Sequence, residues 1–228
     1  MTIEEYIIHG HEKVNGWFSP DAMRIIKSLS DIQTNNNIQS DILEIGIYQG
    51  KSAIFLSMLL TENERLHVVD IFKKDDLYYG LNDREIFEKN INQYCDTNRI
   101  DIFPLSSSEF FKIDYDNYVY LYRLIHIDGS HEKKDVIDDL YQSSDILSPQ
   151  GLIILDDLFN PQHPGVMEGF MEYALQHPCY PFIIGHNKLI FAIDNFTYSF
   201  YKERFKPELY GEYITRNFID DTEVIIFI

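Results

Sequence analysis

The sequence predicts one large α/β domain with a doubly wound, seven-stranded, mostly parallel sheet and an antiparallel hairpin at its C-terminal edge. From residue 40 onward, short apolar runs alternate with longer amphipathic runs, which is typical of strands alternating with helices. Two apolar runs flank Gly185, His186 and Asn187, and this spacing predicts the hairpin. The 228 residues are 45% hydrophobic and 25% charged, which suits a globular protein with a sizeable core.

We expect three segments along the chain. Residues 1–39 form an N-terminal helical segment packed on the core, and residues 40–195 form the domain that carries the sheet. Between them lies the polar, turn-rich stretch 34–40. Residues 196–228 form a C-terminal extension. Its aromatic-rich tail offers a surface for self-association, so a homo-oligomer is one arrangement that we consider.

Helix-capping residues and the spacing of apolar residues predict where the individual helices and strands lie. Ser19 followed by Pro20 is typical of a helix start and predicts a helix over 20–31. Ser106 and Glu109 have the spacing of a capping box. The predicted strands are 42–46, 66–71, 100–104, 124–128, 152–156, 182–185 and 189–193. The further predicted helices are 51–60, 83–94, 107–112, 132–147 and 165–176. The stretch 198–212 has no clear pattern, while 224–228 is apolar enough for a final strand.

The net charge and the composition exclude some classes of binding partner. Lysine and arginine number 19 against 37 aspartates and glutamates, giving a formal net charge of −18. We therefore expect no binding to nucleic acid or anionic lipid, because both need a basic face. No window reaches about 18 apolar residues and no signal-peptide pattern is present, so we expect a cytoplasmic protein without a membrane span. Cys95 and Cys179 are expected to be reduced thiols.

The first predicted strand ends in a glycine-containing loop that opens a helix. Residues 44–52 read EIGIYQGKS. Glycines allow the backbone to turn tightly and to approach a ligand, and a helix N-terminus offers unpaired N–H groups. Because ligands in such sheets bind beyond the carboxyl ends of the strands, the loop is a candidate binding site.

Two ligands are compatible with this loop. Gly46, Gly50, Lys51 and Ser52 resemble the phosphate-binding motif GxxxxGK[ST], which would indicate a Mg²⁺-dependent, P-loop-like NTPase. The loop is one residue too short for that motif, which removes a backbone donor from the phosphate site. The alternative is a nucleoside cofactor whose ribose hydroxyls bind Asp70, at the end of the next strand. Asp70 follows Gly46 by 24 residues, near the roughly 20-residue spacing of that arrangement, which favours the cofactor.

Three acids end two later strands. Asp128 ends one strand, and Asp156 and Asp157 end the other. Adjacent strands lie about 4.8 Å apart, so the carboxylates would converge if these strands are neighbours. Carboxylates that close repel one another, and a hard divalent cation relieves the repulsion. Oxygen ligands favour Mg²⁺, with Mn²⁺ or Ca²⁺ as alternatives, over zinc. One or two of the acids could instead cap helices.

A histidine follows the first of these acids. His131 lies three residues after Asp128, at a predicted helix start, and an imidazole with its ordinary pKa of about 6.5 suits a general base. His163 lies in a loop beside Pro164, which stiffens it. That loop could shape a substrate pocket or simply make a rigid connection.

Together these motifs resemble the class I S-adenosylmethionine (SAM)-dependent methyltransferases, which have a Rossmann-like fold. The resemblance covers residues 40–195. The motifs at 44–52 and 128–131, and Asp156-Asp157 with Pro164-Gly165-Val166, are similar to a metal-dependent branch with macrolide-sugar O-methyltransferases and cephalosporin-hydroxylase-like proteins. The chain departs from that branch in two places: Tyr48 replaces the middle glycine of GxGxG, and Asp156 stands where Glu is usual.

The resemblance implies a role for each motif. Gly46 and Gly50 would contact the methionine end of SAM, Asp70 the ribose, and Ser106 or Ser107 the adenine. Asp128 and His131 would be catalytic. The other cofactor-binding residues of the loop would be Glu44, Tyr48 and Ser52, and the metal ligands would be Asp128, Asp156 and Asp157.

The expected reaction is methyl transfer from SAM to a hydroxyl of a small molecule, assisted by a divalent cation. The resemblance makes a sugar or a glycosylated natural product the expected acceptor. One alternative is a SAM-fold binding module without turnover, and the other is the NTPase.

Overall fold

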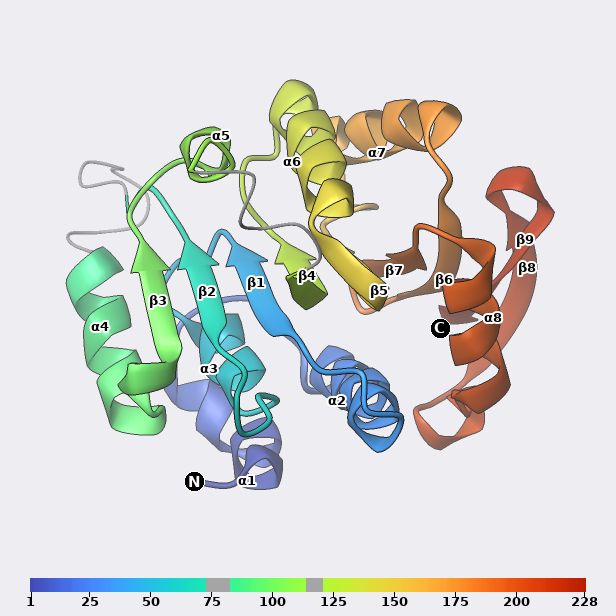
Figure 1. The fold of residues 1–228 in the computed structure, drawn as a ribbon. Coiled ribbons are helices and arrows are strands. Elements are labelled where there is room, and N and C mark those ends of the chain that lie inside the picture. Colours follow the sequence, from blue (N-terminus) through green and yellow to red (C-terminus); the bar gives the residue numbers. More distant parts are fainter. Residues whose placement is uncertain (73–82, 114–120) are drawn as a thin grey trace.

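The computed structural model of the protein describes residues 1–72, 83–113 and 121–228. The strands in these residues form a single nine-stranded sheet in the order β3-β2-β1-β4-β5-β7-β6-β9-β8 (Figure 1). Strands β1 to β5 are parallel, whereas β7 is antiparallel to both β5 and β6. The strands are β1 (Asp41–Ile45), β2 (Leu66–Val69), β3 (Ile100–Phe103), β4 (Tyr122–Ile127), β5 (Leu147–Asp156), β6 (Tyr180–Gly185), β7 (Lys188–Ala192), β8 (Tyr213–Phe218) and β9 (Thr222–Phe227).

Helices cover both faces of the sheet, which confirms the predicted doubly wound α/β fold (Figure 1). Helices α1 to α4 and α8 pack on one face, and α5 to α7 on the other. The helices are α1 (Ile3–Ile8), α2 (Pro20–Asn35), α3 (Lys51–Ser57), α4 (Asp83–Tyr94), α5 (Ser107–Phe110), α6 (Lys133–Asp145), α7 (Pro164–Gln176) and α8 (Asn195–Arg204). Short 3-10 turns are η1 (Gly10–Lys13), η2 (Thr97–Arg99), η4 (Pro207–Leu209) and η5 (Ile219–Asp221).

The predicted number of seven strands is wrong, because the C-terminal extension adds two. Strand β9 pairs in parallel with β6, placing Ile183 opposite Ile225, and β8 pairs with β9. Strand β8 lies at the sheet edge and is largely exposed, so it lacks the apolar alternation that marks a strand in a sequence. The stretch 198–212, which the sequence left unassigned, contains most of α8, and Tyr201 of this helix is fully buried.

The predicted caps are present. The Ser19 hydroxyl accepts a hydrogen bond from the backbone N–H of Ala22 at 3.1 Å and starts α2. Ser106 and Glu109 form the capping box of α5. Both cysteines are free thiols. No helix in the described ranges is long and apolar enough to cross a membrane.

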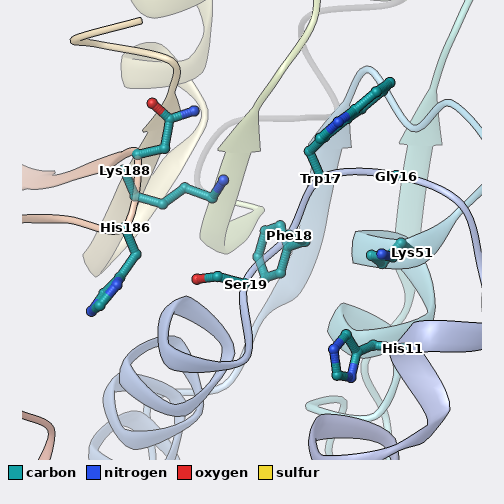
Figure 2. A pocket seen from close by; sticks show the side chains of 9 residues that line it. His11, Gly16, Trp17, Phe18, Ser19, Lys51, His186 and Lys188 are labelled. Atoms are coloured by element: carbon teal, nitrogen blue, oxygen red, sulfur yellow. The ribbon is translucent and has the colours of Figure 1, made fainter.

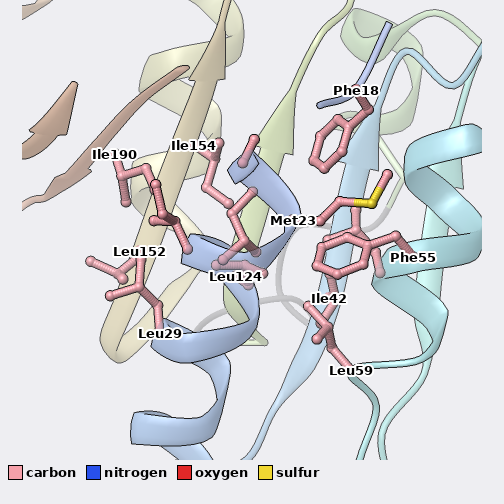
Figure 3. Packing of buried hydrophobic residues seen from close by; sticks show 14 of the residues in the cluster. Phe18, Met23, Leu29, Ile42, Phe55, Leu59, Leu124, Leu152, Ile154 and Ile190 are labelled. Carbon is pink, nitrogen blue, oxygen red and sulfur yellow. The ribbon is translucent and has the colours of Figure 1, made fainter. Parts of the chain in front are cut away.

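Alternating side chains divide the central strands between two apolar layers. Ile42, Leu124 and Leu152 point towards α2 and α3, where they pack around Met23 and Phe55 (Figure 3). The neighbouring strand residues point to the opposite layer, under α6 and α7. At the carboxyl end of the first layer the side chains become polar: Glu44, His126, Asp156 and Lys188. This polar end of the sheet carries the candidate site.

Candidate active site

The glycine loop between β1 and α3 has a left-handed backbone. Gly46 has φ +82° and Gly50 has φ +90°, a region that side chains disfavour. A Cβ atom at Gly46 would collide with the backbone carbonyl of Asp128. Gly46 therefore allows the loop to pack closely against the end of β4.

Tyr48 adopts a backbone conformation that usually requires glycine. Its φ is +46°, which a bulky side chain disfavours. Its backbone N–H donates to Asp70 Oδ2 at 3.2 Å, and its ring lies 5.6 Å from that of Trp17. These contacts support the left-handed turn although the middle glycine of the motif is absent.

Asp70 holds the loop in place. Its Oδ2 also accepts from the N–H of Ile47 at 2.8 Å, and its Oδ1 accepts from the N–H of Phe72 at 2.7 Å. The carboxylate thus joins the ends of β1 and β2. A carboxylate has room for about four acceptor contacts, so a ribose hydroxyl can still bind, and this role stays a prediction.

The other predicted cofactor residues differ in accessibility. Glu44 is fully buried, and its Oε1 lies 3.0 Å from His126 Nδ1. Ser52 is 8% exposed in the first turn of α3. The half-buried Ser106 uses its hydroxyl in the α5 cap, while the neighbouring Ser107 hydrogen-bonds the buried Asp139. Their proposed contacts with SAM stay predictions.

Two of the three predicted metal ligands lie together. Ligand atoms of Asp128, Asp156 and His126 lie within 4.8 Å of one another. The Asp156 carboxylate also contacts the Lys188 ammonium, and both side chains are buried. Burial and the charge of Asp128 nevertheless raise the pKa of Asp156 to about 6. Asp156 therefore lies between a like charge, Asp128, and an opposite charge, Lys188, in a buried position.

Asp157 belongs to a second group of ligand atoms, with His131 and His163. His131 Nε2 lies 3.0 Å from Asp157 Oδ2 and 3.8 Å from Asp128 Oδ1. The neighbouring Asp128 and Asp157 carboxylates raise the pKa of His131 to about 9. The rings of His131 and His163 stack with centroids 3.7 Å apart. The predicted base thus lies between two predicted metal ligands.

Sequence reasoning missed Lys188, Asn187 and His126 as parts of this site. The hairpin prediction held the signal for Lys188, because the antiparallel register of β5 and β7 places Lys188 directly opposite Asp156. Asn187, in the hairpin turn, donates to Asp156 Oδ1 at 3.2 Å. His126 lies opposite Glu44 in the register of β1 and β4. Strand pairing, which the sequence leaves open, was needed to find all three.

A pocket of about 440 Å³ lies between the N-terminal segment, α3 and the β6–β7 hairpin. The N-terminal segment contributes Trp17 and Phe18 to its lining, α3 contributes Lys51, and the β6–β7 hairpin contributes His186 and Lys188. Figure 2 shows the Lys188 side chain extending from the hairpin towards Phe18. Lys188 belongs both to the wall of this pocket and to the ion pair with Asp156.

A family model described as a methyltransferase domain matches residues 43–158, just over half of the chain. The protein belongs to this methyltransferase family. The match covers the glycine loop, Asp70 and the three acids, and confirms the predicted class of enzyme, a SAM-dependent methyltransferase. The NTPase alternative gains no support from this match. No curated protein sequence matches the chain.

Solved structures show the same fold at low sequence identity. An O-methyltransferase from Bacillus cereus in complex with SAH is 17% identical, with a TM-score of 0.58, and the match covers 83% of this chain and 88% of that one. The O-methyltransferase NovP is 15% identical, with a TM-score of 0.60 and coverage of 77% and 81%. TomG from Streptomyces achromogenes, an O-methyltransferase of tomaymycin synthesis in complex with SAM, is 15% identical, with a TM-score of 0.56 and coverage of 84% and 88%.

Proposed function

We propose that this methyltransferase transfers the methyl group of SAM to a hydroxyl oxygen of a small molecule, with a divalent cation at the carboxyl end of the sheet. The observation that carries the proposal is the position of His131 between Asp128 and Asp157, where a base and hard ligands serve one reacting oxygen. Three similarly folded proteins are named as O-methyltransferases, which supports oxygen as the acceptor atom. A sugar hydroxyl or a glycosylated natural product remains our expected acceptor.

The loop and Asp70 are suited to hold the cofactor. The loop backbone turns at Gly46 and Gly50, and the Asp70 carboxylate fixes the turn while lying at the neighbouring strand end. Bound SAM would supply the electrophilic methyl group. The protein orients the donor and the acceptor so that the methyl group and the attacking oxygen are aligned.

The acids fit a hard cation in chemistry and in charge. Asp128 and Asp156 are close neighbours, and the charge of Asp128 adds to the effect of burial in raising the pKa of Asp156. We propose that these two carboxylates hold the cation and that Asp157 completes the set. When bound, the cation would polarise the acceptor hydroxyl and offset the charge that holds a proton on His131. His131 Nε2, which lies 3.0 Å from Asp157, would accept the hydroxyl proton.

Product analysis tests this proposal. The purified protein is incubated with isotopically labelled SAM and a panel of sugars and glycosides, with Mg²⁺ or with excess chelator. We expect an O-methyl product that requires the divalent cation. Full activity in excess chelator would remove the metal from the reaction and leave Lys188 as the positive charge beside Asp156. Tight SAH binding without any product would favour the binding module.

An Asp156→Asn variant separates the metal from the cofactor. The change removes one charge from the proposed cation site but leaves the glycine loop and Asp70 intact. We expect metal-dependent turnover to be lost while SAH affinity, measured by calorimetry, stays within about threefold of wild type. Asp31→Asn, at an exposed position of α2, is the matched control for the loss of a carboxylate.

A further inference from the structure

The pocket has two lysines in its lining, Lys51 and Lys188, together with the histidines His11 and His186. Among the described residues that line it, none is an aspartate or a glutamate. Acidic residues outnumber basic ones by 37 to 19 in the whole chain, so this lining differs in sign from the average surface. A cavity lined by one sign of charge concentrates ligands of the opposite sign.

Within the described ranges, Lys51 forms no ion pair. It begins α3, and no carboxylate lies within 4.0 Å of its ammonium in the ion pairs of the described residues. Burial lowers the pKa of Lys51, and Glu12 acts on it only through its longer-range charge. An ammonium that has lost part of its water is stabilised by an anion that reaches it.

Lys188 links the pocket to the proposed reaction centre. Its ammonium contacts the Asp156 carboxylate and lies 4.5 Å from the centroid of the Phe18 ring. An ammonium has three donors, and Asp156 uses one of them in this arrangement. Lys188 is only 4% exposed, so it adds its charge to the inner wall of the pocket, while the half-buried Lys51 offers the accessible ammonium.

The same pocket offers an exposed aromatic surface. The Trp17 side chain is 74% exposed, although its ring contacts that of Tyr48. Phe18 lines the pocket next to it (Figure 2). Exposed indole beside an apolar ring commonly marks a surface that packs against a ligand. The ligand thus needs an apolar or aromatic body as well as a negative charge.

We propose that this pocket binds the methyl acceptor, and that the acceptor is an acidic small molecule with a carboxylate or phosphate on an apolar body. Lys51 binds the anion, Lys188 adds positive charge at the inner wall, and Trp17 packs against the body. The inference rests on the proposed function in one respect, that the bound molecule is the acceptor. It deepens that function by narrowing the acceptor, from sugars in general to a hydroxyl compound that carries an anionic group on an apolar body, such as an acidic glycosylated natural product.

Trp17 makes the binding step measurable, because it is the single tryptophan of the chain. Without cofactor, the full-length protein is titrated with 3-phenylpropionate, with its uncharged amide and with phenyl phosphate, while indole fluorescence is followed. We expect the anions to change the fluorescence with a Kd at least about tenfold lower than that of the amide. The ratio of the two anion affinities distinguishes a carboxylate site from a phosphate site. Equal affinities for the acid and the amide would overturn the proposal.

Lys51→Gln tests where the charge acts. We expect this variant to lose the preference for the anions, whereas Lys206→Gln, the same change at an exposed position, keeps it. SAH binding to Lys51→Gln is measured in parallel. If SAH affinity falls and the preference for the anions remains, the charge serves the methionine carboxylate of the cofactor and the proposal is wrong. If the product analysis shows no methyl transfer but the anion preference is intact, the proposed function is rejected, whereas the assignment of the pocket as an anion-binding site stands.

Discussion

The Lys188 ammonium contacts the Asp156 carboxylate at the carboxyl end of β5, and both side chains are at least 95% buried. The register of β5 and β7 places the two residues directly opposite each other. Asp156 also accepts the backbone N–H of Asp157 at 2.8 Å. The methyltransferase thus has a fixed positive charge inside its candidate active site, next to the acids proposed to hold a metal.

Lys188→Met is expected to destabilise the protein strongly. The change leaves Asp156 without its cationic partner in a buried position, which typically costs about 3–5 kcal/mol. Urea unfolding at neutral pH measures the effect. Adding Asp156→Asn should recover part of the loss, because the unpaired charge is then gone. A loss below about 1 kcal/mol in the single variant would show that the contact contributes little.

Arg123 provides a second, fully enclosed ion pair. Its guanidinium binds both carboxylate oxygens of Glu64, at 2.7 and 2.9 Å, and the side chain is fully buried. Replacing Arg123 with Met should lower the free energy of unfolding by about 3–5 kcal/mol, because Glu64 then loses its buried partner. Arg65→Met is the matched control, since its pair with Asp101 is partly exposed to solvent and should cost less than about 1 kcal/mol. Similar losses in both variants would contradict the account.

Asp139 should make stability depend on pH. Burial raises its pKa from 3.8 to about 7, and one carboxylate oxygen has no hydrogen-bond partner. Between these values the folded state binds more protons than the unfolded state, so this contribution to stability is complete below about pH 4 and is lost as the pH rises through about 7. Each tenfold difference in proton affinity between the folded and unfolded states corresponds to about 1.4 kcal/mol.

We therefore expect Asp139→Asn to gain stability relative to wild type as the pH rises from 5 to about 8. Denaturant unfolding at several pH values measures the difference. Asp138→Asn, the exposed neighbour on α6, should show no such trend. A constant difference between wild type and Asp139→Asn across this range would mean that Asp139 titrates normally.

Asp70→Ala should weaken SAH binding by about 1.5–3 kcal/mol, the scale of hydrogen bonds to a charged group. The variant would lose the proposed ribose contact. It would also release the N–H groups of Ile47 and Tyr48, which now fix the loop. Calorimetric titration with SAH measures the change, and unchanged affinity would refute the ribose assignment.

Local signals in the sequence were sufficient for most of the fold. Ser19 and the Ser106–Glu109 pair mark helix starts through contacts a few residues away, and both caps are present. Residues 83–94 have a helical period, and α4 has these bounds. Strand β8 escaped prediction because its exposed edge position imposes no apolar pattern.

The candidate site depends on contacts between distant segments, so less of it could be predicted. Asp128 and Asp156 were expected to meet because each ends a parallel strand, and they lie in one group. Asp157 was expected in the same group. It lies instead beside His131 and His163, and its backbone there is left-handed, with φ +62°. Lys188 could be found only from the strand register.

Calorimetric titration of the purified protein with SAH and with ATP, each with and without Mg²⁺, tests the central claim most directly. The account predicts that SAH binds with micromolar affinity in either condition and that ATP–Mg²⁺ does not bind. Lys51→Ala should leave SAH affinity nearly unchanged, because the loop is proposed to bind SAH through its backbone. Binding of ATP–Mg²⁺ that disappears in Lys51→Ala, with no binding of SAH, would contradict the account and restore the phosphate-loop interpretation.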